Sequence, residues 1–264
     1  MSRIQAAFER AERENRAALV VYLCAGDPDL PTTEKLVLAA IEAGADVIEL
    51  GVPFSDPTAD GPVIQRASER ALAKGTTLAH ALGIAAKVRA TSEAGIVLFG
   101  YYNPILAMGE ERFAAQAKQS GVDGVLVVDL PPEEAGSLLA PLEAQGLDFI
   151  PLVAPTTPDA RVERIARSAR SFLYYVSLTG VTGAEADLDK AGERATALKA
   201  RTGKRVAIGF GIKTPAQAKK AAQKADGVVV GSAVCSAVEA AKSPEDAVRA
   251  VRALVLELRA ACAR

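Results

Sequence analysis

Residues 46–62 read Asp46-Val47-Ile48-Glu49-Leu50-Gly51-Val52-Pro53-Phe54-Ser55-Asp56-Pro57-Thr58-Ala59-Asp60-Gly61-Pro62. A short apolar run from Val47 to Leu50 is followed by a segment rich in proline and glycine, and then by a helical pattern from Pro62 to Lys74 with Gly75 after it. An apolar run without strict polar alternation is typical of a parallel strand that is covered on both faces. This stretch therefore predicts a unit of strand, loop and helix, and the fold depends on how often that unit recurs.

The unit recurs along the whole chain. Helices are predicted, for example, from Glu34 to Ala43, with Thr33 as the start signal, and from Gly109 to Ser120. About eight units without a Pro- or Ser-rich linker predict one (β/α)8 TIM barrel over residues 1–264, with an extra helix within residues 1–15. A doubly wound open sheet is the alternative, although the segment from Cys24 to Pro28 lacks the Gly-x-Gly-x-x-Gly turn of a dinucleotide site. The predicted strands are Leu19 to Cys24, Val47 to Leu50, Gly95 to Phe99, Gly124 to Val128, Phe149 to Val153, Phe172 to Val176, Val206 to Ile208 and Gly227 to Val230.

The composition of the chain excludes several classes of protein. Of its 264 residues, 50% are hydrophobic and 24% are charged, and the formal net charge is −1. A disordered chain contains fewer apolar residues, and a nucleic-acid-binding protein usually carries a basic excess. No secretory signal or apolar stretch of the roughly 20 residues that span a membrane is found. We therefore expect a cytoplasmic protein that binds neither membrane nor nucleic acid.

The cysteines and the histidine offer little for metal or nucleophilic chemistry. Cys24, Cys235 and Cys262 are far apart and form no Cys-x-x-Cys pair, so each is predicted to be a small buried apolar residue in a reducing compartment. The single histidine, His80, is predicted to lie on the surface of a helix. We expect no metal site, and acid–base chemistry would have to come from carboxyl groups, lysine or tyrosine.

Two carboxylates on one strand–loop unit are the first candidates for chemistry. Glu49 lies in an apolar strand near its carboxyl end, where burial raises the pKa of a carboxyl group and allows it to give and take a proton near neutral pH. The alternative is a Glu49 that forms a structural ion pair with Lys or Arg. Asp60 ends a loop that its prolines make rigid, so that Asp56 and Asp60 can be held in defined positions, and the alternative for Asp60 is a turn or helix-capping role.

Glycines follow the last two predicted strands, in Gly209-Phe210-Gly211 and in Gly231-Ser232, which opens a short helical stretch from Ala233 to Ala241. Phosphate-binding barrels hold the anion at these two loops on backbone N–H groups. Simple turn formation is the alternative.

The loop from Ser177 to Asp189 has the composition of a lid or of an ordinary surface loop. Tyr101-Tyr102-Asn103-Pro104 and Asp129-Leu130-Pro131-Pro132 follow the third and fourth strands and can line a pocket, contact a partner or form turns.

With these motifs in place, the chain closely resembles the tryptophan synthase alpha chain family over essentially its whole length. The segment from Glu49 to Pro62 is the most specific part of the resemblance. The other matching segments, in chain order, are Tyr102-Asn103-Pro104, Gly121 to Val125, Asp129-Leu130-Pro131, Val153 to Thr157, Tyr175-Val176-Ser177, Gly180 to Ala184, Gly209 to Ile212 and Ala225 to Ser232.

The resemblance implies a barrel that cleaves indole-3-glycerol phosphate to indole and glyceraldehyde 3-phosphate in a retro-aldol reaction without metal or organic cofactor. It implies that Glu49 protonates indole C3 and takes the proton of the glycerol hydroxyl, in either order. It further implies that Asp60 accepts a hydrogen bond from the indole N–H and stabilises the positive charge on the ring. The other residues that it implies are Gly183, Gly211, Gly231 and Ser232 at the phosphate, Tyr22, Phe99, Leu126, Tyr174 and Phe210 around the indole, and Thr182 in the lid.

The resemblance also implies a partner, a beta chain that carries pyridoxal phosphate and joins this chain in an α2β2 complex. The Asp56 loop, Asn103-Pro104 and Pro131-Pro132 would face that partner, and no pyridoxal-binding lysine is expected here. Two alternatives stay open: a freestanding lyase that releases indole or acts on a related sugar phosphate, and a non-catalytic phosphate-binding barrel that regulates a partner.

Overall fold

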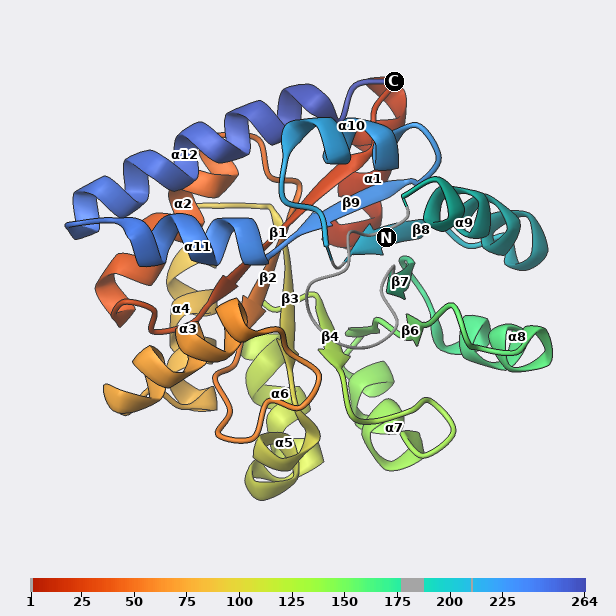
Figure 1. Cartoon of the computed structure of the whole chain (residues 1–264). Coiled ribbons are helices and arrows are strands. Elements are labelled where there is room, and N and C mark those ends of the chain that lie inside the picture. Colours follow the sequence, from red (N-terminus) through yellow and green to blue (C-terminus); the bar gives the residue numbers. More distant parts are fainter. Residues whose placement is uncertain (1, 177–187, 210) are drawn as a thin grey trace.

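The computed structural model describes residues 2–176, 188–209 and 211–264 and contains, within them, twelve helices and nine strands (Figure 1). Most strands are followed by one or two helices. All strand pairs are parallel, and the strand order is β5-β4-β3-β2-β1-β9-β8-β7-β6. The strands are β1 (Ala18–Cys24), β2 (Val47–Gly51), β3 (Gly95–Gly100), β4 (Gly124–Val127), β5 (Asp148–Phe149), β6 (Leu152–Val153), β7 (Leu173–Val176), β8 (Val206–Gly209) and β9 (Gly227–Val230).

The two end strands of the sheet are consecutive in the chain. β5 pairs with β4 and β6 pairs with β7, and only Ile150 and Pro151 lie between them. β5 and β6 are therefore two parts of the single strand predicted from Phe149 to Val153, which is interrupted where Pro151 lacks an N–H group. The chain itself joins the two ends of the sheet, so the predicted TIM barrel is confirmed and an open doubly wound sheet is excluded.

The barrel strands are covered on both faces, as the apolar runs predict. Every residue of β1 is buried. Leu19 and Leu23 pack outward against the surrounding helices, whereas Val20 and Tyr22 belong to the cluster inside the barrel. Because side chains alternate along a strand, one face of each strand builds the helix layer and the other fills the barrel.

The helices form the outer layer, and one predicted helix start is wrong. α2 begins at Leu30 and not after Thr33, because the Asp29 side chain accepts a hydrogen bond from the Thr32 N–H (2.7 Å) and caps the helix. The Thr33 hydroxyl instead donates to the Asp29 carbonyl (2.8 Å). The helices are α1 (Arg3–Arg13), α2 (Leu30–Glu42), α3 (Pro62–Ala73), α4 (Leu78–Arg89), α5 (Tyr102–Met108), α6 (Glu110–Gln119), α7 (Gly136–Ala144), α8 (Asp159–Ser168), α9 (Leu188–Thr202), α10 (Pro215–Ala222), α11 (Ser232–Ala240) and α12 (Pro244–Ala261).

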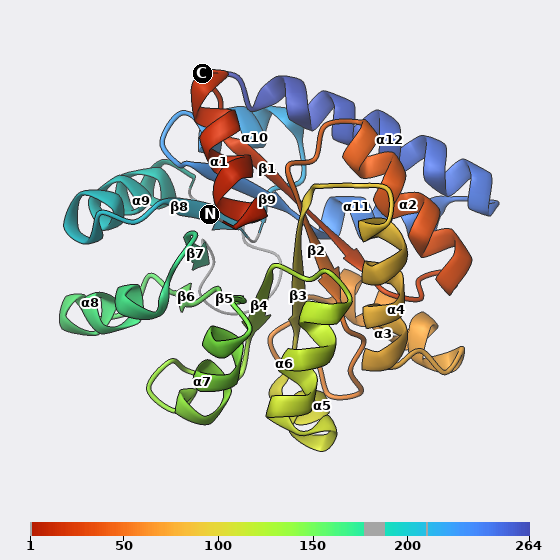
Figure 2. The ribbon, with the colours of Figure 1, turned by 180° about the vertical axis from the view of Figure 1, so that it is seen from behind.

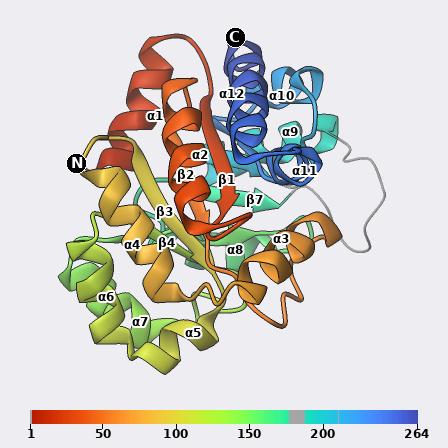
Figure 3. The ribbon, with the colours of Figure 1, turned by 90° about the vertical axis from the view of Figure 1, so that its left-hand side faces the viewer.

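The predicted N-terminal helix, α1, closes one end of the barrel and lies in front of the strands in Figure 2. Its Phe8 side chain is buried and stacks on Phe172 with ring centroids 5.0 Å apart. A Cβ atom at Gly227, at the start of β9, would lie 2.9 Å from the Phe8 ring, so glycine permits this close approach. Figure 3 shows α1 on one side of the strands and α3 and α11 on the other. The carboxyl ends of the strands are therefore the end available for a site.

No helix in the described part of the chain is both long enough and apolar enough to cross a membrane.

Candidate active site

Glu49 points into the barrel from β2, on the same face as Val47. The residue is 1% exposed, and its Oε1 atom has no hydrogen-bond partner among the described residues. No lysine or arginine of the described residues pairs with it, so the structural ion pair considered from the sequence is not formed. Burial raises the pKa of Glu49 to about 8. Glu49 is therefore protonated near pH 7 and lies beside the apolar cluster inside the barrel.

Asp60 is held by the loop between β2 and α3. The Tyr101 hydroxyl donates a hydrogen bond to Asp60 Oδ2 (3.1 Å) and accepts one from the Ala59 N–H (3.0 Å), and the Tyr101 ring stacks on Phe54 at 4.9 Å. Asp60 Oδ1 is buried and has no hydrogen-bond partner in the part of the chain that the structure describes. Gly61 occupies the N-cap position of α3, so Asp60 is not the helix cap considered from the sequence.

The environment of Asp60 raises its pKa to about 6, because burial disfavours the charged form more than the hydrogen bond from Tyr101 favours it. Asp60 is thus ionised at neutral pH while Glu49 keeps its proton. From the sequence, the segment around Tyr101 can line a pocket, contact a partner or form a turn, and no role is assigned to Tyr101 itself. The contact of Tyr101 with Asp60 was not predicted, because it joins residues 41 positions apart.

Two buried tyrosines show that both carboxyl groups lie in one neighbourhood. Burial raises the pKa values of Tyr22 and Tyr174 well above the ordinary value, and the negative charges of Glu49 and Asp60 raise both further. The Tyr22 side chain lies over Gly51 of β2, where a Cβ atom would be 2.2 Å from the tyrosine hydroxyl oxygen. The two strands thus bring Tyr22 and the two carboxyl groups together.

The residues predicted to surround the indole lie inside the barrel as far as the structure describes them. The four described members of this set are buried and belong to one interior cluster, and Tyr22 meets Phe99 edge to face with ring centroids 5.3 Å apart. These members are Tyr22, Phe99, Leu126 and Tyr174. Phe210, the fifth predicted member, lies outside the described residues.

The predicted phosphate loops follow β8 and β9. Gly211 has a φ of 89°, a conformation that side chains other than glycine rarely adopt. Gly231 is the N-cap residue of α11, and Ser232 is its first residue. Gly183, Thr182 and the remainder of residues 177–187, the predicted lid, lie outside the described residues.

Two predictions are confirmed, namely that the three cysteines are buried and that His80 lies on the surface of a helix. Cys24, Cys235 and Cys262 are buried, and burial is the main reason why the pKa of Cys24 rises to about 12. His80 is exposed near the start of α4, where its Nδ1 atom accepts a hydrogen bond from the Thr77 N–H (3.2 Å). Within residues 2–176, 188–209 and 211–264, no group of three or more His, Cys, Asp and Glu side chains can hold a metal ion.

This arrangement is suited to proton transfer on an aromatic substrate that also carries an anion. A protonated carboxyl group and an ionised one share an interior lined by aromatic rings. A glycine turn and the amino end of a helix, both suited to bind an anion, follow β8 and β9.

Comparisons with known proteins agree with this arrangement. The family profile described as "Tryptophan synthase alpha chain" matches residues 8–263. The alpha chain of tryptophan synthase from Dechloromonas aromatica is 51% identical over 261 residues, which cover 98% of this chain and 97% of that protein. The alpha chain from Geobacter sulfurreducens is 52% identical over 90% of this chain and 91% of its own length.

Solved structures show the same similarity. A chain of Mycobacterium tuberculosis tryptophan synthase superimposes with a TM-score of 0.92 at 38% identity, over 100% of this chain and 99% of that one. Tryptophan synthase subunit alpha from Legionella pneumophila superimposes with a TM-score of 0.90 at 40% identity, over 99% of this chain and 98% of that one.

Proposed function

Because this chain belongs to the tryptophan synthase alpha chain family, we propose that it cleaves indole-3-glycerol phosphate into indole and glyceraldehyde 3-phosphate with Glu49 and Asp60 as its catalytic residues. The chain is thus a lyase. The carbon–carbon bond that breaks joins indole C3 to the hydroxyl-bearing carbon of the glycerol chain. We propose further that residues 1–264 form one TIM-barrel domain around this reaction.

In the proposed mechanism, protonated Glu49 gives its proton to indole C3, which makes the ring a cation and a good leaving group. The Glu49 carboxylate then takes the proton of the neighbouring glycerol hydroxyl while the carbon–carbon bond breaks. The bonding electrons return to the ring and neutralise its cation, the hydroxyl carbon becomes the aldehyde, and Glu49 is again protonated. Asp60 accepts the indole N–H and stabilises the positive charge that exists between the two steps.

The observation that carries this proposal is the pair of buried, unsatisfied carboxyl oxygens, Glu49 Oε1 and Asp60 Oδ1. A buried polar atom without a partner costs free energy, so a fold retains such atoms mainly where a ligand satisfies them. One of these two oxygens is on an acid and one on an anion, and both carboxyl groups act on Tyr22 and Tyr174, two tyrosines of the buried cluster inside the barrel.

At the phosphate we propose Gly211, Gly231 and Ser232, with Gly183 from the family resemblance. We expect Gly211→Asp to weaken binding of the substrate by about tenfold or more, because a second negative charge would meet the phosphate. The measurement is calorimetric titration with glycerol 3-phosphate. Gly211→Asn is the control, since it has nearly the same size and backbone strain but no charge. Equal affinities of the two variants would contradict the placement of the phosphate.

The pKa values predict a bell-shaped dependence of kcat/KM on pH. Protonation of Asp60 below about pH 6 removes the charge that stabilises the ring cation, and ionisation of Glu49 above about pH 8 removes the acid. Activity should therefore be highest between these values. The measurement is the initial rate at low substrate from pH 5 to pH 9.5, and an Asp60→Asn variant should lose the acidic limb. A flat profile over this range would contradict the assignment.

As an alpha chain of tryptophan synthase, the protein has a beta chain as its partner. We propose an α2β2 complex in which the Asp56 loop, Asn103-Pro104 and Pro131-Pro132 face the beta chain. These three segments follow β2, β3 and β4, which are neighbours in the sheet. We also propose that this chain needs no cofactor of its own, that pyridoxal phosphate is bound only by the beta chain, and that the complex is cytoplasmic.

The test of the function is the release of indole from indole-3-glycerol phosphate by the purified chain, alone and with the beta chain of a relative. Slow release that the beta chain accelerates supports the proposal. Rapid release that the beta chain does not change would favour a freestanding lyase. No release under either condition would favour a non-catalytic phosphate-binding barrel.

A further inference from the structure

Four charged side chains join two helices and a loop beside the proposed site. Arg70 on α3 donates Nε and Nη2 to the two carboxylate oxygens of Asp27 (2.8 and 2.9 Å) and Nη1 to Glu239 Oε1 (2.8 Å). Arg66, one turn earlier on α3, donates to both oxygens of Glu239 (2.7 and 2.8 Å). We call these residues, Asp27, Arg66, Arg70 and Glu239, the α3–α11 clasp.

The clasp is more than an isolated surface ion pair. Asp27 is 3% exposed, and a carboxylate at such a depth needs a partner with good geometry. Exposed single pairs contribute little to stability, but paired N–H donors on a carboxylate define a direction as well as an attraction. The hydrogen bond from Arg66 is the main reason why the pKa of Glu239 falls to about 2, so Glu239 stays ionised in the working pH range.

The clasp joins the two helices that begin at the two ends of the proposed substrate site, the indole end and the phosphate end. α3 begins at Pro62, two residues after Asp60, and α11 begins at Ser232, directly after Gly231. Small residues, Ala67 on α3 and Cys235 on α11, belong to one buried cluster and allow the two helices to approach closely. Figure 3 shows α3 and α11 side by side at the same end of the barrel. The clasp joins the two helices on the partly exposed side of this contact.

We propose that the α3–α11 clasp positions Asp60 relative to the amino end of α11, and so sets the span between the groups that bind the indole nitrogen and the phosphate. Arg70 is the central positioning residue, because, of the two arginines in the clasp, only Arg70 bonds to both Asp27 and Glu239. This inference rests on the proposed function. It predicts that a ligand which reaches both ends depends on the clasp, whereas a ligand that occupies only one end does not.

The test variant is Glu239→Ala, because it releases α11 while Arg70 keeps its bonds to buried Asp27. The probes are an indolylalkyl phosphate, which lacks the hydroxyl needed for cleavage, and its two halves, indole and glycerol 3-phosphate. Glu239→Ala should weaken calorimetric binding of the spanning ligand by roughly tenfold and change binding of either half by less than about twofold. In turnover, KM should rise by about the same factor as the dissociation constant while kcat stays within about threefold of the unmodified chain.

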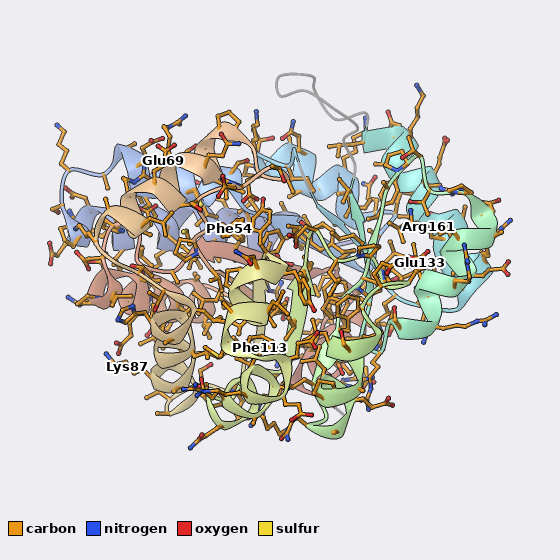
Figure 4. The ribbon with its side chains drawn as sticks, turned by 90° about the horizontal axis from the view of Figure 1, so that it is seen from below. Phe54, Glu69, Lys87, Phe113, Glu133 and Arg161 are labelled. Carbon is orange, nitrogen blue, oxygen red and sulfur yellow. The ribbon has the colours of Figure 1, made fainter. Side chains whose placement is uncertain are left out.

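A matched control lies on the other side of the barrel, where Arg161 donates to both oxygens of Glu133 (2.8 and 3.3 Å; Figure 4). The Glu133 side chain is 29% exposed and that of Glu239 is 31% exposed, so Glu133→Ala removes a similar ion pair away from the site. Glu133→Ala should leave binding of all three probes unchanged. If Glu239→Ala does not fold, Arg66→Met supplies a milder test, because it removes two of the three bonds to Glu239 while the bond from Arg70 remains. The spanning ligand should then still lose affinity, by a smaller factor, and neither half should.

Three results would overturn the inference. Unchanged binding of the spanning ligand by Glu239→Ala would show that the clasp does not set the span. Equal losses for the spanning ligand and for both halves would show a general structural defect. If the unmodified chain neither binds nor cleaves indolyl glycerol phosphates, the proposed function fails, and this inference fails with it.

Discussion

Replacing Glu49 with glutamine should reduce the turnover of indole-3-glycerol phosphate by roughly 10²- to 10⁴-fold, the usual contribution of a general acid or base. Glutamine is nearly isosteric with glutamic acid but can neither give a proton to indole C3 nor take one from the glycerol hydroxyl. Binding of the substrate should change little, so the loss should appear in kcat. Stopped-flow or steady-state detection of indole measures it. Normal turnover by Glu49→Gln would exclude the proposed mechanism.

The same variant should be more stable than the unmodified chain at high pH, which also shows that it is folded. The pKa of Glu49 is about 8 in the folded state and 4.5 for the unperturbed group. Between these values the unfolded chain loses a proton that the folded chain keeps, so the free energy of unfolding of the unmodified chain falls as pH rises, by a few kcal/mol in total. Glutamine does not titrate. Denaturant unfolding should therefore show a gain in stability for Glu49→Gln that is small near pH 5 and large above pH 8.

Replacing Asp60 with asparagine should reduce kcat by roughly 10²- to 10³-fold, because a fixed charge near the ring cation is lost. The asparagine carbonyl still accepts the indole N–H, so binding of the uncleaved substrate should change less than turnover does. The hydrogen bond from Tyr101 to the side chain can also remain. The loss therefore measures the charge rather than the shape of the residue.

Asp56→Asn is the matched control for Asp60→Asn, since it makes the same chemical change on the same loop. Asp56 is exposed, and its carboxylate accepts a hydrogen bond from the Ser55 hydroxyl (2.6 Å). Activity of the isolated Asp56→Asn chain should stay within about twofold, as for most surface substitutions. Similar losses from both variants would mean that the loop responds to any loss of charge and that Asp60 has no special role.

The barrel and its candidate acid could be predicted because both depend on local patterns. A strand that is covered on both faces needs apolar residues at every position, so Glu49 is conspicuous within Val47–Gly51. The split of the strand at Pro151 was not predicted, since the same apolar run continues on both sides of it. The start of α2 was placed at Thr33, since Asp29 and Thr33 are both residues that commonly cap helices and only the observed hydrogen bonds distinguish them.

By itself the sequence determined which segments form strands, where several of the helices follow them, and where carboxylates and glycines follow the strands. These properties depend on neighbours a few residues apart. Only the tertiary structure decided that no cation of the described residues pairs with Glu49, that Tyr101 holds Asp60, and that Arg70 and Glu239, 169 positions apart, join α3 to α11. Those facts depend on which faces meet when the barrel closes, and closure brings together side chains that no local pattern relates.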